Sequence, residues 1–326
     1  MHSTTASPWS KAWARIFHSE SNGLNQLTGF EQTRLTWARK IGPYDEVPEA
    51  FRSSLRALIG QAAPFPHVVL TPTYEGLWRR ENEKLVFCYD ARVYVLEKTK
   101  SQVTTTCYAP EDIHLVEVGE ILLDSWIRIG GLASSRKPTT SMFRFNTVTG
   151  YLFVPIIQQM RVAAQNTAES DMDAERTKFD YLEKQDYKFM NFGRRSILPG
   201  ERVIATLLQP DIHAAMPSLL ARFAKLISPV HLSILTDQEL ILIKDDINVR
   251  RIDKNMRHGG IWEYIPLNKI VSVSLAEKNA RLLALSINLP EGECVDSLFA
   301  VSKRSEVDTF VEQLKARIPS SATKAI

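Results

Sequence analysis

Short runs of alternating hydrophobic and polar residues fill positions 230–318 of the chain. The runs are rich in Val, Ile, Leu and aromatic residues, and Asp, Asn, Gly or Pro bounds each of them. This pattern is typical of antiparallel strands joined by turns. The last run instead has helical spacing, which predicts an amphipathic helix; its apolar positions are Val307, Phe310, Val311, Leu314 and Ile318. The segment therefore predicts a sheet that one C-terminal helix closes.

An earlier segment has the same order. Alternating runs predict strands at residues 67–73, 83–89, 92–97, 102–108, 113–118, 125–130 and 141–148. A helix is expected next, with its apolar face formed by Leu152, Phe153, Ile156, Ile157 and Met160. Because proline is unfavourable inside a helix, Pro155 predicts that this helix starts late or is kinked.

The two segments also align with each other. Residues 89–98 match residues 235–244, and Tyr108-Ala-Pro matches Tyr264-Ile-Pro, with one extra residue after it in the second segment. Phe143-Arg-Phe precedes the first closing helix as Leu298-Phe-Ala precedes the second. Self-similarity of this length indicates two copies of one domain.

Helices are expected outside the two copies. One begins at Ser7-Pro8, a second runs from Thr28 to just before Gly42, and a third runs from Pro48 to Gly60. Further short helices are expected between the copies and in an insertion at residues 214–227. The predicted division is an N-terminal helical segment, a first domain, a helical linker, a second domain and a tail, at residues 1–62, 63–165, 166–198, 199–319 and 320–326.

Composition narrows the functional classes. The chain has 326 residues, 44% hydrophobic and 24% charged, with a net charge of +3, which matches globular proteins and disfavours a nucleic-acid binder. Its three cysteines are far apart, so neither a disulfide framework nor a zinc site is expected, and a reducing cytoplasm fits best. No metal and no cofactor are predicted.

Motifs of catalysis are absent from the sequence. It contains no metalloprotease His-Glu-x-x-His, no phosphate loop, no Gly-x-Ser-x-Gly and no dinucleotide-binding glycine pattern. The seven histidines lie singly, at no metal-ligand spacing. The prediction is that the protein is not an enzyme, and an enzyme of unrecognised type is the third hypothesis.

The second copy resembles the bacterial pleckstrin-homology-like (PH-like) domains, and the first copy resembles them more weakly. The residues that carry the resemblance are 235–243, 264–270 and the helix after Ser305. The resemblance implies a mainly β (α+β) fold with two tandem PH-like barrels, each of about seven antiparallel strands closed by a C-terminal helix. It also implies a non-catalytic role in binding, and it fixes no ligand.

In this family the loops after strands one, three and six gather at one open end. Phosphoinositide-binding members bind anions there, so the basic residues of these loops are candidates for an anion or lipid site. In the first copy they are Arg79, Arg80, Lys98, Lys100, Arg136 and Lys137. In the second copy they are Arg250, Arg251, Lys254 and Arg257, although Glu291 and Glu293 would oppose an anion.

The first N-terminal helix is a second candidate surface. Its aromatic face lies opposite the basic residues Lys11 and Arg15, as in helices at a membrane interface; the face consists of Trp9, Trp13, Ile16 and Phe17. Docking of this face on the protein's own domains is the commoner arrangement and is favoured here.

A binding or scaffolding function is therefore predicted, with a protein partner or self-association. Exposed strand edges are a further option, because domains of this fold can bind an extended peptide as an added strand. The alternative is a peripheral protein that binds anionic lipid headgroups through the basic loops and the N-terminal helix. The expected location is the cytoplasm, and the alternative places the protein at the inner face of the membrane.

Overall fold

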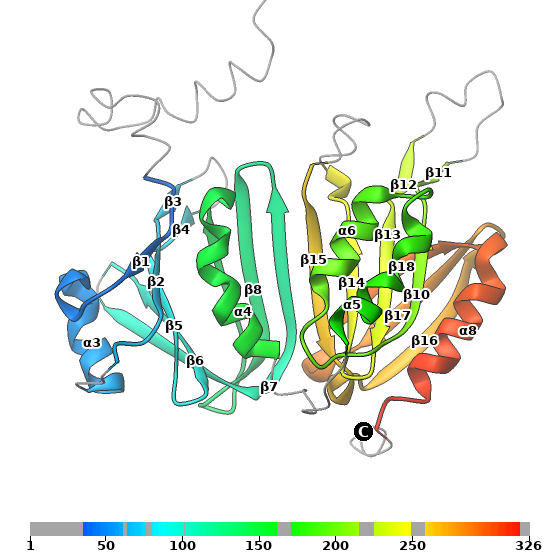
Figure 1. Cartoon of the computed structure of the whole chain (residues 1–326). Coiled ribbons are helices and arrows are strands. Elements are labelled where there is room, and N and C mark those ends of the chain that lie inside the picture. The colour runs from blue at the N-terminus through cyan, green and yellow to red at the C-terminus, as the bar shows by residue number, and fades with distance from the viewer. Residues whose placement is uncertain are drawn as a thin grey trace, which may run out of the picture.

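The computed structural model describes residues 35–60, 64–75, 80–100, 102–161, 171–214, 225–248 and 258–319. In this part the fold is mainly β, with antiparallel sheets and helices packed against them (Figure 1). Within these ranges no helix has both the length and the apolar character needed to cross a membrane. The predicted helix at residues 7–18 and the tail from residue 320 lie outside the described residues.

The first copy contains six principal strands and a closing helix. They are β2 (Val68–Thr71), β5 (Lys84–Tyr89), β6 (Arg92–Lys98), β7 (Val103–Ile121), β8 (Asp124–Ala133), β9 (Pro138–Phe145), the 3-10 helix η3 (Thr147–Phe153) and α4 (Val154–Arg161). A small hairpin, β3 (Tyr74–Glu75) with β4 (Arg80–Glu81), follows β2. The late start predicted for the closing helix is confirmed, because α4 begins at Val154 and Pro155 falls in its first turn.

Two strand boundaries predicted in the first copy are wrong. Residues 102–108 and 113–118 belong to one 19-residue strand, β7, in which the register shifts between Tyr108 and Leu115. Pro110 lies in this irregular stretch, where a missing N–H interrupts no regular ladder. The strand predicted at 141–148 ends at Phe145, because the Asn146 side chain accepts a hydrogen bond from Val148 N and caps η3.

The second copy repeats this order with seven principal strands. They are β10 (Val203–Gln209), β13 (His231–Thr236), β14 (Glu239–Lys244), β15 (Gly260–Pro266), β16 (Ser272–Asn279), β17 (Leu282–Asn288) and β18 (Cys294–Ala300), followed by α8 (Arg304–Lys315). The helix predicted in the insertion is wrong at its end, because Leu226 lies in β12 (Leu226–Ser228), which pairs with β11 (Ile212–His213). Residues 215–224 are outside the described part.

One antiparallel sheet runs through both copies. It begins with β1 (Arg39–Ile41), and its order is β1-β2-β5-β6-β7-β15-β14-β13-β10, with β8 paired to β7 and β9 to β8. Strands β16, β17 and β18 form a separate sheet. None of the sheets in the described part closes on itself, so the mainly antiparallel β class is established and the two barrels stay a prediction.

The N-terminal segment is only partly helical in its described part. Helix α3 (Glu49–Ile59) is confirmed, and its buried residues Phe51, Leu55 and Ile59 lie on one face. The helix predicted from Thr28 is wrong over its last residues, because Arg39–Ile41 form strand β1, which pairs with β2. Pairing with a neighbouring strand overrides the local helical pattern here.

In each copy a helix covers the face of the main sheet that is turned away from that copy's closing helix. Phe51 and Leu55 of α3 pack against Leu85 and Phe87 in the first copy. In the second copy this position is taken by the linker helices α5 (Met172–Thr177) and α6 (Tyr187–Ser196), with Phe189 in the same core as Leu232 and Ile241. The repeated unit therefore includes a preceding helical segment, which the sequence comparison did not show.

The copies are joined where β15 pairs with the second half of β7. The register runs from Gly260 opposite Glu120 to Tyr264 opposite Val116. Gly259 precedes this ladder with φ +80°, and a Cβ there would overlap the carbonyl oxygen of Glu120. Only glycine fits such a position without displacing the backbone.

We expect Gly259→Ala to destabilise the protein by at least ~3 kcal/mol, because an overpacked contact adds to the cost of a positive φ. Gly292→Ala is the matched control. Gly292 also has a positive φ, of +77°, but nothing lies within 4 Å of its added Cβ, so only about 1 kcal/mol is expected. Urea unfolding of both variants measures the difference, and equal losses would contradict the steric argument.

Candidate functional site

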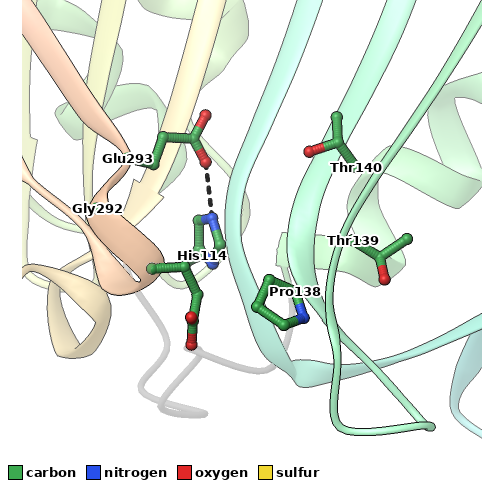
Figure 2. Close-up of a pocket in the computed structure, with 7 residues that line it drawn as sticks. His114, Pro138, Thr139, Thr140, Gly292 and Glu293 are labelled. Atoms are coloured by element: carbon green, nitrogen blue, oxygen red, sulfur yellow. Dashed lines mark hydrogen bonds and ion pairs between the residues drawn. The ribbon is translucent and has the colours of Figure 1, made fainter.

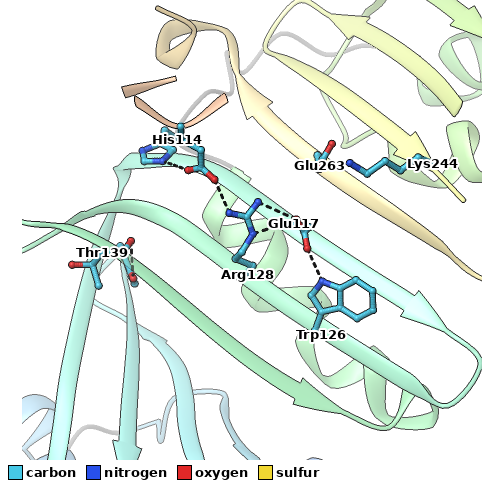
Figure 3. Close-up of polar contacts among 9 residues, drawn as sticks. His114, Glu117, Trp126, Arg128, Thr139, Lys244 and Glu263 are labelled. Atoms are coloured by element: carbon cyan, nitrogen blue, oxygen red, sulfur yellow. Dashed lines mark hydrogen bonds and ion pairs between the residues drawn. The ribbon is translucent and has the colours of Figure 1, made fainter. Parts of the chain in front are cut away.

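A series of hydrogen-bonded polar side chains crosses the junction between the two copies (Figure 3). Glu117 on β7 accepts hydrogen bonds from Trp126 Nε1 at 2.6 Å and from Arg128 Nη2 at 3.0 Å. Arg128 Nη1 in turn donates to Glu293 Oε1 at 2.6 Å, and His114 Nε2 lies 2.7 Å from Glu293 Oε2. Glu293 comes from the second copy, so this series of hydrogen-bonded side chains links both copies.

Glu293 is held ionised by its partners. Hydrogen bonds from His114 and Arg128 lower its pKa from 4.5 to about 2. The sequence suggested that this glutamate would oppose an anion in a loop of the second copy. In the structure its charge is engaged by the first copy.

A second ion pair lies on the β15 side of the junction. Glu263 on β15 stands directly across from Glu117 on β7, and like charges in such a position repel each other. Glu117 has Arg128 as its cation, and Glu263 has Lys244, whose Nζ lies 2.7 Å from Glu263 Oε1. Burial raises the pKa of Glu263.

An open pocket of about 320 Å³ lies beside this series of side chains (Figure 2). The hairpin of β8 and β9 forms one wall and the turn before β18 forms the other, with His114 between them; the lining residues are His114, Pro138, Thr139, Thr140, Glu291, Gly292 and Glu293. His114 and Glu293 are paired with each other across the pocket wall. Among the described residues no group of three or more His, Cys, Asp or Glu is placed to hold a metal ion.

A buried ionic cluster connects the copies on another side. Arg161, at the end of α4, pairs with Glu239 on β14, donates to Ser196 O at 2.7 Å and lies 3.7 Å from Glu201. Its guanidinium stacks 3.9 Å from the ring centroid of Tyr264. Burial and the charge of Glu239 raise the pKa of Glu201 to about 9, so at neutral pH one arginine faces one carboxylate and one neutral acid.

The basic loops of the first copy do not all come together. Lys98 is at the end of β6, where it pairs with Val103, and Lys100 follows it in the turn. Arg136 and Lys137 lie in the turn after β8, whose Ser134 Oγ accepts from Arg92 at the start of β6. The seven residues of β6 from Arg92 to Lys98 separate the two pairs by ~20 Å along the strand.

Most of the other predicted site residues lie outside the described part. The side chain of Arg80 lies outside the described part, as do the whole residues Arg79, Arg250, Arg251, Lys254, Arg257, Trp9, Trp13, Ile16 and Phe17. The anion and lipid roles of all these residues therefore stay predictions. Of the described candidates, Lys98 lies 3.7 Å from Glu83 and Arg136 lies 3.5 Å from Asp112, and both basic side chains are largely exposed, so neither ion pair contributes much to stability.

Sequence reasoning missed the junction. His114 and Glu293 are 179 positions apart, and each stands alone in the sequence without a motif. The one available signal was the pair Gly259-Gly260 at the start of a strand, because glycine in a strand often marks a close approach of another backbone.

No protein-family model matches this sequence, and no curated protein matches it. The function is therefore inferred from the arrangement of the residues.

We expect Glu239→Gln to destabilise the protein by more than ~2 kcal/mol, because it removes the carboxylate that pairs with the buried Arg161 and leaves only Glu201, 3.7 Å away, to ionise in a buried position. Glu201→Gln is the matched control. Glutamine resembles the neutral acid that the pKa of about 9 implies, so a loss of no more than ~1 kcal/mol is expected at pH 7. Denaturant unfolding at pH 7 tests the pair, and a loss for Glu201→Gln as large as that for Glu239→Gln would refute the assigned protonation.

The junction is also expected to weaken in acid. A folded pKa of about 2 against 4.5 for Glu293 means that the carboxylate stabilises the fold above pH 4.5 and that this contribution disappears as the pH falls toward 2. Glu293→Gln should lower stability at pH 7 by about 1 to 2 kcal/mol and flatten the dependence between pH 4.5 and 2. Thermal unfolding across this range checks it, with Glu291→Gln in the same exposed turn as the control.

Proposed function

We propose that this chain is a non-catalytic binding protein built from two PH-like domains. It engages a protein partner, including a second copy of itself, through a strand added to β16. The order of strands followed by one closing helix in each copy supports the PH-like assignment. The two copies also share one sheet, which suits a scaffold that holds its binding surfaces at a constant separation.

The open edge of β16 carries this proposal. In the first copy the corresponding strand is the second half of β7, and β15 pairs with its outer edge. In the second copy β16 pairs with β17 alone among the described strands. Ser272, Ser274 and Ala276 are exposed along it, and their small side chains leave the backbone accessible. The protein thus fills one such edge with its own strand and leaves the equivalent edge available.

The polar groups of the junction favour binding over catalysis. His114, Glu117, Arg128 and Glu293 are bonded to one another, so none of the four offers a poised base or nucleophile. The separation of Lys98 from Arg136 likewise removes support from a single anion site in the first copy. Protein binding by strand addition is therefore favoured over anionic lipid.

Selection of random peptides on the full-length protein tests the proposal. Peptides that bind as strands should slow amide hydrogen exchange in Ser272–Asn279, because backbone groups of an edge strand become hydrogen-bonded. Sedimentation of the protein over a range of concentrations tests the same edge for self-association. Protection confined to the pocket beside His114, or to the basic loops, would contradict the assignment to β16.

A further inference from the structure

Exposed hydrophobic side chains gather at one end of the first copy. Eight large hydrophobic or aromatic side chains are exposed in the described part, and six of them belong to three neighbouring segments at this end; the six are Leu35, Leu122, Leu123, Val148, Tyr151 and Val154. Tyr151 is 70% exposed. The other two, Tyr181 and Tyr187, lie in the linker. A cluster of this kind marks an interaction surface; these six residues are called the apolar patch below.

Hydrogen bonds hold the three segments of the apolar patch together. Thr147 N donates to Leu123 O at 3.3 Å, which places η3 beside the turn between β7 and β8. Asn146 N donates to Thr36 O at 3.1 Å, which brings Leu35 to the same place. In Figure 1 the β7–β8 turn, the start of α4 and the entry of the chain into β1 all lie at the upper end of the first copy.

Neither the backbone conformation of the turn nor the packing of the core requires its two leucines. Leu122 adopts φ +55°, a conformation for which turns normally use Gly, Asn or Asp. Leu122 and Leu123 are 52% and 56% exposed, so the core does not require them either. The equivalent turn of the second copy, between β16 and β17, has Ala280 and Arg281. Hydrophobic residues at this turn are therefore particular to the first copy.

We propose that residues 1–34 of the same chain cover the apolar patch, with Trp9, Trp13, Ile16 and Phe17 in contact with it. These residues lie outside the described part, and the chain leaves them at Leu35, within the patch. A helix over residues 8–17 would be ~15 Å long, and residues 18–34 can extend to ~56 Å. The connection is thus long enough to place the aromatic face on the patch.

Charges around the patch favour this occupant over an anionic membrane. Glu120 and Asp124 flank the two leucines, and each pairs with an arginine, Glu120 with Arg195 at 3.4 Å and Asp124 with Arg144 at 2.8 Å. These two ion pairs carry no net positive charge that would attract an anionic surface. They are compatible with the aromatic face of the N-terminal segment.

Tryptic cleavage of the full-length protein after Lys11 and Arg15 tests the proposal. Docking slows cleavage, so the double variant Leu122→Ser/Leu123→Ser should be cut about tenfold faster than the wild type, which corresponds to about 1.4 kcal/mol of lost docking. Both leucines are about half exposed, so the fold should tolerate the change. Tyr187→Ser, which removes an exposed side chain of the linker, should leave the rate unchanged.

A second pair of substitutions completes a double-mutant cycle. Trp9→Ser/Trp13→Ser should raise the cleavage rate by a similar factor, and the four substitutions together should give no further increase, because the same contact has already been lost. Equal cleavage rates in the wild type and Leu122→Ser/Leu123→Ser would overturn the proposal. Flotation of the wild type with neutral vesicles, abolished by Leu122→Ser/Leu123→Ser, would also overturn it, because the bilayer would then be the occupant.

Discussion

Strand β7 pairs with three neighbouring strands. Its first half pairs with β6, and its second half lies between β8 and β15. A backbone that is hydrogen-bonded on both edges cannot tilt without breaking one ladder, so the two copies are held as a single unit. Leu115, in the middle of β7, extends this coupling, because its side chain belongs to the hydrophobic core of the second copy. The strand that completes the first domain thus also helps to fill the second.

The charged residues at the junction define its geometry more than they stabilise it. Removing Arg161 and Glu239 from water costs free energy that their attraction only partly offsets. The same is true of Glu263, which is almost fully buried beside Lys244. The pair of Arg161 with Glu239 forms only in one docked arrangement of the copies, however, and any other arrangement would leave a buried charge without its partner. We infer that this cluster selects the angle between the copies, whereas apolar burial and strand pairing supply most of the stability.

Local patterns predicted the elements whose stability is local. Helix α3, helix α8 and the start of α4 follow from spacing and proline position within one segment. Strand β1 has only three residues, too few to show an alternating pattern, and it exists because β2 lies beside it. The contact between His114 and Glu293 depends on the β7–β15 pairing, which joins residues far apart in the chain. Side-chain periodicity records which face of a strand is buried, and it carries no information on which strand lies at its edge.

The two copies differ most at positions that the shared fold does not constrain. An edge that is paired in the first copy, at β7, has no partner among the described strands in the second, at β16. A turn that carries Leu122 and Leu123 in the first copy carries Ala280 and Arg281 in the second. Fold stability explains neither difference, because an unpaired edge and an exposed leucine both favour unwanted association. Features that are costly for an isolated protein are retained most readily where a partner or another segment of the chain covers them, and the edge of β16 and the apolar patch are two such features.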